Sequence, residues 1–121
     1  MNSTLYKENI LDHYKNPRNF KRLKHFDKKA FLDNITCGDE MEVFLKIEDE
    51  IIKDISFDAR GCAISIAAMS MLSEKVKGKK ISEVKKITDE EMLSMLGMDE
   101  NTPRDKCALL GLQTVKKALS S

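Results

Sequence analysis

The spacing of the apolar residues changes at Gly61-Cys62, and this change restricts the fold more than any other feature of the sequence. Between residues 31 and 59 apolar side chains alternate with more polar ones, which is the period of a strand with one buried face. After Cys62 they recur every three or four positions, which is the period of an amphipathic helix. Strands followed by helices, without alternation between them, indicate an α+β fold.

Three strands are predicted in the alternating part. Residues 31–35 form a short first strand, and residues 41–47 and 51–59 form a hairpin around the polar turn at residues 49–50. Phe44 interrupts the alternation of the second strand, because it falls among the polar positions. Since a hairpin with a short turn is antiparallel, we expect a three-stranded antiparallel sheet with one covered face.

Helices are predicted on both sides of the strands in the sequence. The first covers residues 5–14, and Asn16-Pro17 ends it, because the residue before proline avoids the helical region. The later ones are a helix from Cys62 to Gly78, a short turn of helix at 82–86, a helix from the capping box at 88–91 to Gly97, and a last helix from about Arg104, started by Thr102 and Pro103. We expect the N-terminal and C-terminal helices to pack on one face of the sheet, and residues 1–121 to form a single domain.

Charge and composition argue against several classes of protein. Lys and Arg number 21 and Asp and Glu number 20, so no overall field favours nucleic acid or a membrane surface. The beginning of the sequence has no apolar run of the kind that a signal peptide or a membrane span needs. We therefore expect a cytoplasmic protein with reduced thiols. Three cysteines, an odd number, also argue against a fully paired disulfide framework.

A basic segment at residues 15–29 joins the first helix to the first strand. It contains seven Lys or Arg, one Asp and His25, and is predicted to be a loop held to the body by Phe20, Leu23 and Phe26. The simplest interpretation is a solvated basic edge. The alternative is a docking surface for an acidic partner.

Four residues are candidates for a shared site. Cys37 and Asp39 flank Gly38 where the first strand ends, and the glycine allows the backbone to turn both side chains toward one point. Cys62 follows the third strand and begins a helix, and Cys107 lies in the first turn of the last helix. A helix N-terminus stabilises a thiolate, which applies to Cys62 and Cys107. Three cysteines at the ends of three separate elements favour one common site.

Three thiolates and a carboxylate can complete a tetrahedral zinc site or hold the irons of a small cluster. The oxygen ligand from Asp39 makes such a site more exchangeable than four sulfurs would be. The competing interpretations are that the cysteines only fill the core, or that they hold a structural zinc ion. A catalytic pair of cysteine and histidine is disfavoured, because His13 lies in the first helix and His25 in the basic segment.

A family resemblance rests on four segments in the same order along the chain. They are residues 10–19 (ILDHYKNPRN), 34–39 (NITCGD), 61–65 (GCAIS) and 106–110 (KCALL). Together they resemble the U-type iron–sulfur cluster assembly scaffolds: the Isc and Nif scaffolds and their zinc-containing Suf relative, SufU. The resemblance implies a three-stranded sheet packed by helices, with Cys37, Asp39, Cys62 and Cys107 clustered at one exposed end.

The resemblance also implies a function and partners. The sulfur donor would be a pyridoxal-phosphate-dependent cysteine desulfurase, and sulfur would arrive as a persulfide on one of these cysteines. We favour Cys37 as the acceptor, because its loop is the most flexible by composition, and Cys107 is the alternative. In Isc-type members a transient 2Fe–2S cluster is built on Cys37, Asp39, Cys62 and Cys107 and passed to apo iron–sulfur proteins. In the SufU-type alternative, zinc held by the same residues supports sulfur acceptance without any cluster. A third hypothesis is a structural zinc domain for protein contacts.

Departures from the family pattern leave the subtype open. Isc-type scaffolds have a histidine before the third cysteine, where this chain has Lys106, as the Suf relative does. The Suf relative carries an insertion before its third cysteine that this chain lacks, and the usual proline after Asn34 is Ile35. The scaffold role is the preferred hypothesis. A scaffold requires no catalysis, whereas a sulfur acceptor could be an enzyme, so this question stays open. The oligomeric state cannot be read from the sequence.

Overall fold

The computed structural model describes residues 3–35, 38–98 and 104–120. In chain order its elements are α1 (Ser3–Lys15), β1 (Lys28–Asn34), β2 (Asp39–Glu48), β3 (Ile51–Arg60), α2 (Ala63–Val76), α3 (Ile81–Lys85), α4 (Asp89–Met95) and α5 (Asp105–Ser120). The strands form an antiparallel sheet in the order β1-β2-β3. The predicted α+β class and the three-stranded antiparallel sheet are therefore confirmed.

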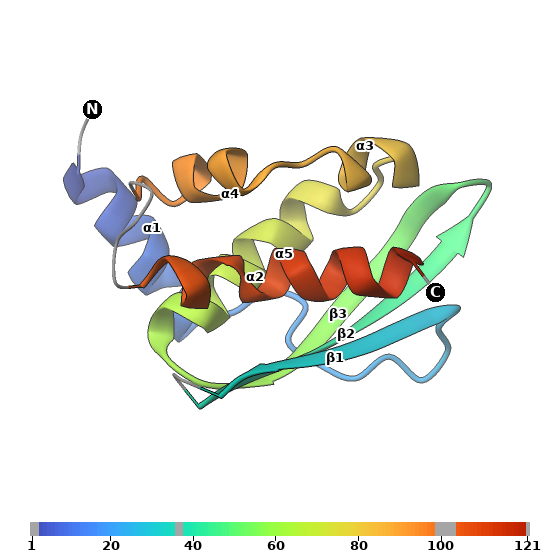
Figure 1. Cartoon of the computed structure of the whole chain (residues 1–121), viewed down its shortest axis with the longest axis horizontal. Coiled ribbons are helices and arrows are strands. Elements are labelled where there is room, and N and C mark those ends of the chain that lie inside the picture. Colours follow the sequence, from blue (N-terminus) through green and yellow to red (C-terminus); the bar gives the residue numbers. More distant parts are fainter. Residues whose placement is uncertain (1–2, 36–37, 99–103, 121) are drawn as a thin grey trace.

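The helices form a layer on one face of the sheet, as predicted (Figure 1). Helix α5 packs along β1 and β2, α2 packs against α5 and β3, and α1 packs against α2. Between the layers lies a core of apolar side chains such as Val43, Leu45, Phe57, Leu72 and Leu112, each without exposed surface. Burial of this much apolar surface stabilises the fold.

The loop that joins α1 to β1 runs along the free edge of β3 and then covers part of the opposite face of the sheet. Asn19 accepts a hydrogen bond from the backbone of Phe57 on β3, at 3.0 Å. The Arg22 guanidinium lies 4.8 Å from the centre of the Phe44 ring, and the Phe26 ring lies 5.3 Å from it. Phe44 interrupts the alternation of β2 because it faces this loop, and it is buried there at 2% exposure. Phe20 also anchors the loop, through its ring contact with Phe57.

Three polar contacts tie the first helix and the start of the loop to α2. Ser70 Oγ lies 2.7 Å from His13 Nδ1 and accepts a hydrogen bond from the Arg18 backbone at 2.8 Å. Ser73 Oγ accepts from the Asn19 side chain at 2.8 Å. Both serines are fully buried. Much of the segment that carries ILDHYKNPRN therefore has a structural role, namely to join α1 and the loop to α2.

The predicted boundaries differ from the structure mainly at the first strand. It begins at Lys28, three residues before the predicted start, because Lys28 to Ala30 pair with Leu45 to Val43 of β2. The capping box is confirmed, since Thr88 Oγ1 accepts a hydrogen bond from the Glu91 backbone at 3.1 Å. The predicted start signals Thr102 and Pro103 lie outside the described residues. Within the described ranges, every helix is too short or too polar to cross a bilayer.

Candidate metal centre

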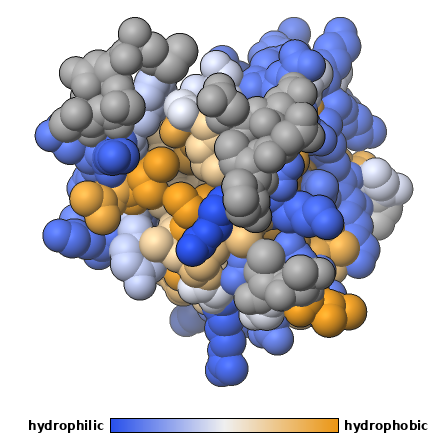
Figure 2. Space-filling view, turned by 60° about the vertical axis from the view of Figure 1, so that its left-hand side comes forward, coloured by the Kyte–Doolittle hydropathy of each residue, from blue (hydrophilic) through white to orange (hydrophobic). Residues whose placement is uncertain are grey.

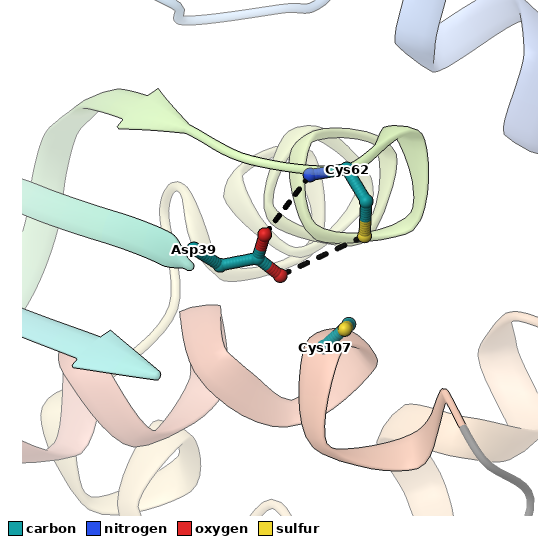
Figure 3. A group of neighbouring side chains, drawn as sticks. All are labelled: Asp39, Cys62 and Cys107. Carbon is teal, nitrogen blue, oxygen red and sulfur yellow. Dashed lines mark hydrogen bonds between the residues drawn. The ribbon is translucent and has the colours of Figure 1, made fainter. Parts of the chain in front are cut away.

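Three chain segments that are far apart in sequence end at the same edge of the sheet. Asp39 is the first residue of β2, Cys62 stands between β3 and α2, and Cys107 lies in the first turn of α5 (Figure 3). One carboxylate oxygen and the two sulfur atoms all lie within 4.8 Å of one another. The structure therefore brings together three of the four predicted site residues. Cys37 lies outside the described residues, two positions before Asp39 along the chain.

The strand register explains why Asp39 meets the segment that carries Cys62. Glu40 of β2 pairs with Arg60 of β3, so the next position of the antiparallel ladder brings Asp39 alongside Gly61. A Cβ atom at Gly61 would overlap the Asp39 carboxylate. The absence of a side chain at this position lets the carboxylate lie directly against the junction of β3 and α2.

The Asp39 carboxylate is held by donors from α2 and its N-cap. Oδ1 accepts a hydrogen bond from the Cys62 backbone at 3.0 Å, and Oδ2 accepts one from Ser65 Oγ at 2.5 Å. Cys62 Sγ lies 3.6 Å from the same Oδ2 atom (Figure 3). Burial acts to raise the pKa of Asp39, but the hydrogen bonds from Ser65, Cys107 and Cys62 outweigh it and hold the pKa below its ordinary value. Asp39 is therefore a carboxylate at neutral pH.

The two described cysteines differ in accessibility. Cys62 is half-buried, whereas Cys107 is 3% exposed. The residues that flank the undescribed pair 36–37 are open to solvent, since Ile35 is 89% exposed and Gly38 is also exposed. At this end of the molecule apolar side chains reach the surface between hydrophilic ones (Figure 2). The site thus has a covered side at α5, and Ile35 and Gly38 near its other side are exposed.

This donor set fits a thiophilic metal ion. Two ligands of a tetrahedral zinc ion lie about 3.3 to 3.8 Å apart, given metal–ligand bonds of about 2.0 to 2.3 Å. The observed limit of 4.8 Å among the three ligand atoms is about 1 Å wider, a distance that small side-chain rotations can close. Thiolates select zinc or iron–sulfur centres over harder cations. The three residues offer three ligand atoms, and the sequence predicts Cys37 as the fourth ligand.

Both histidines lie where the sequence predicted. His13, on α1, is half-buried and hydrogen-bonded to Ser70 rather than to a thiol. Burial, followed by the charge of Arg18, lowers the pKa of His13 below its ordinary value. His25 is exposed in the loop before β1. Neither belongs to the group of ligand atoms found among the described residues, so a catalytic pair of cysteine and histidine has no support there.

Sequence reasoning missed Ser65. The residue is 2% exposed, and its hydroxyl contacts Asp39, Cys62 and the Cys107 backbone carbonyl. A spacing of three residues after Cys62 at a predicted helix start places both side chains on one side of the first turn. That signal was present in the GCAIS segment, but nothing in the sequence indicated that Asp39 would lie on the same side.

Residues 5–121 match the NifU-like N-terminal domain family. The chain belongs to this family. It is 36% identical over 117 residues to the "Iron-sulfur cluster assembly scaffold protein IscU 1" of Archaeoglobus fulgidus, covering 95% of the chain and 74% of that protein. It is also 32% identical to the "Zinc-dependent sulfurtransferase SufU" of Bacillus subtilis, covering 97% of the chain and 90% of that protein. The family resemblance read from the four segments is confirmed.

A solved structure from the same NifU-like family shares the fold. The N-terminal part of a NifU-like protein from Brucella abortus superimposes with a TM-score of 0.81, covering 95% of this chain and 92% of that one, at 19% identity. At this identity the likeness concerns the fold alone. The alignment with the Bacillus subtilis protein spans 134 residues, more than the 121 of the chain, so that relative carries residues which this NifU-like chain lacks.

Proposed function

We propose that this chain is an assembly scaffold on which a 2Fe–2S cluster is built and from which it is passed to apo iron–sulfur proteins. The observation that carries the proposal is the meeting of Asp39, Cys62 and Cys107 within 4.8 Å, from three separate elements, in a chain of the NifU-like family. In this proposal Cys37, Asp39, Cys62 and Cys107 are the ligands. Iron and the assembled cluster are substrate and product rather than resident cofactors.

The sulfur donor in this proposal is a pyridoxal-phosphate-dependent cysteine desulfurase that carries a persulfide, and Cys37 is the acceptor. The Cys37 thiolate attacks the terminal sulfur of the donor's persulfide. A new S–S bond forms on Cys37, the donor's S–S bond breaks, and the donor cysteine leaves as a thiolate. Burial supports this choice, because Cys107 is 3% exposed whereas the neighbours Ile35 and Gly38 are open to a bulky partner.

Asp39 supplies the exchangeable ligand in this scheme. Its oxygen is a harder donor than the sulfurs, and its hydrogen bonds from Cys62 and Ser65 keep the carboxylate satisfied when the cargo leaves. A site that must release its contents benefits from one such ligand. We further propose that residues 1–121 act as one domain, in the reducing cytoplasm that keeps these thiols available.

A second candidate function is a zinc-dependent sulfur acceptor that stimulates the desulfurase and carries no cluster. It is favoured by Lys106 before Cys107 and by the similarity to the Bacillus subtilis sulfurtransferase over nearly the whole chain. In this case zinc held by the same four residues keeps the thiols ionised until the partner displaces one ligand. Sulfur would then be found on Cys37 after desulfurase turnover, as mass spectrometry can show.

Anaerobic reconstitution separates the two functions. Reduced protein is mixed with ferrous iron, cysteine and a cysteine desulfurase, and visible absorption is followed before and after addition of an apo-ferredoxin. The scaffold role predicts a chromophore that disappears as the acceptor gains its cluster, and Cys62→Ser serves as the ligand-deficient control. A colourless protein that retains stoichiometric zinc would overturn the scaffold role and favour the sulfur acceptor.

A further inference from the structure

Ser65 contacts every described member of the candidate metal centre. It lies in the first turn of α2, and its Oγ atom is 2.5 Å from Asp39 Oδ2, 3.3 Å from the Cys107 carbonyl oxygen and 3.6 Å from Cys62 Sγ. At 2% exposure it is shielded from solvent. One hydroxyl therefore links the start of β2, the start of α2 and the first turn of α5.

The hydroxyl proton goes to Asp39. A serine hydroxyl has one proton to donate, and of its two oxygen partners the carboxylate is both the nearer and the charged one. Since Oδ1 is held by the Cys62 backbone, both carboxylate oxygens are restrained by donors at the start of α2. Oδ2 is also the oxygen that lies nearest to Cys62 Sγ (Figure 3). The Ser65 hydrogen bond thus determines the direction in which the ligand oxygen points.

We propose that Ser65 is a positioning residue that holds Asp39 in the geometry needed for metal binding before the metal arrives. The inference rests on the proposed function insofar as Asp39 is taken to be a ligand. Hydrogen bonds to ligating carboxylates orient them, and loss of such a partner typically lowers metal affinity about 10- to 100-fold. Without the hydroxyl, Asp39 can rotate about its side-chain bonds and must be ordered again each time a metal ion binds.

Helix α2 provides a matched control in Ser73. It is buried like Ser65 and makes two hydrogen bonds, donating to the Ser70 carbonyl and accepting from the Asn19 side chain. Its partners belong to α2 and to the loop after α1, not to the metal centre. Ser73→Ala therefore removes the same chemical group from the same helix without touching Asp39.

The test measures the affinity of reduced, metal-free protein for zinc alone, by competition with a chromophoric chelator in the absence of oxygen. Ser65→Ala should weaken zinc binding about 10- to 100-fold, and Ser73→Ala should change it less than about threefold, which is within the scatter of unrelated buried changes. The isosteric pair Ser65→Thr and Ser65→Val supplies a second comparison at constant side-chain volume. The threonine variant, which keeps the hydroxyl, should bind zinc at least about tenfold more tightly than the valine variant.

A double-mutant cycle identifies Asp39 as the route of the effect. In an Asp39→Ala background, Ser65→Ala should have no further effect on zinc affinity, because the hydroxyl no longer has a ligand to orient. The visible spectrum of the cobalt-substituted protein should change in Ser65→Ala and stay unchanged in Ser73→Ala. A merely structural serine would produce equal losses with and without Asp39.

The outcomes separate this inference from the proposed function. If Ser65→Ala and the Thr/Val pair bind zinc like the parent protein, Ser65 has no positioning role, while the metal centre itself stands. Equal weakening in the presence and absence of the Asp39 carboxylate also overturns the inference. If the parent protein binds no thiophilic metal at all, the proposed function fails before Ser65 is considered.

Discussion

Replacement of Gly61 by alanine tests how the sheet register builds the metal centre. Gly61 follows Arg60 at the end of β3, and a Cβ atom there would overlap the Asp39 carboxylate. Carbon and carboxylate oxygen cannot occupy the same space, so either the carboxylate or the backbone between β3 and α2 must move. We expect the carboxylate to move, because the backbone at this point is shared by the strand and the helix.

The magnitude follows from the hydrogen bonds that are lost. A displaced Asp39 carboxylate loses its bonds from the Cys62 backbone and from Ser65 Oγ, at 3.0 and 2.5 Å. Each hydrogen bond to a charged group contributes about 1.5 to 3 kcal/mol to the free energy of unfolding. The lost hydrogen bonds alone should cost about 3 kcal/mol, at the lower end of the summed range, because the carboxylate can regain water beside the exposed Gly38. The positive φ of Gly61, +156°, adds backbone strain to this loss.

Urea unfolding of the reduced, metal-free protein measures this loss, and zinc competition measures the effect on the site. Gly78→Ala is the control: nothing lies within 4 Å of a Cβ atom at Gly78, but its φ of +86° is a left-handed conformation. That substitution should cost about 1 to 2 kcal/mol of stability and leave zinc affinity unchanged. If Gly61→Ala unfolds at the parent's urea concentration and binds zinc with the parent's affinity, the contact between Gly61 and Asp39 is wrongly assigned.

Three further changes test other parts of the structure. Asp39→Ala should slow transfer of the cluster to an apo-acceptor, because the exchangeable ligand is lost; the decay of visible absorption measures this, and equal or faster transfer would remove Asp39 from that role. Joint replacement of Cys37, Cys62 and Cys107 by serine should leave the circular dichroism spectrum and cooperative unfolding intact, since the apolar core lies between the sheet and the helices; an unfolded variant would indicate a structural zinc domain instead. Below about pH 6.5 the unfolded chain protonates His13 before the folded one does, because burial lowers the pKa of His13 in the fold. The contribution of His13 to stability should therefore be fully present above that pH and be lost as the pH drops through the lowered pKa of His13. Urea midpoints measured at several pH values should depend less on pH in His13→Asn than in the parent protein.

The secondary structure was largely predictable because it depends on local patterns. Alternation and helical spacing located the strands and the helices, and the Thr88 cap was identified correctly from four consecutive residues. The start of β1 was missed because Lys28 and Lys29 have no strand-like pattern of their own. They join the sheet through backbone pairing with β2, which depends on the partner strand and not on their side chains.

Phe44 shows a second limit of local reasoning. By its position in the alternation, Phe44 points away from the helices. On that face of the sheet the sequence pattern predicts polar side chains, not an aromatic one. The loop that carries Arg22 and Phe26 crosses that face of the sheet and covers it. Such long-range coverage is not encoded in the period of the strand, so only the folded chain could explain the residue.

The sequence by itself determined which side chains could form the site: three cysteines at the ends of regular elements, and an aspartate two residues from the first. It could do so because glycine positions and helix starts are local properties of the chain. Only the tertiary structure decided that Asp39, Cys62 and Cys107 meet, that Cys107 is covered, and that Ser65 restrains the carboxylate. These facts depend on the strand register and on the packing of α5 against the sheet, which bring together residues more than twenty positions apart.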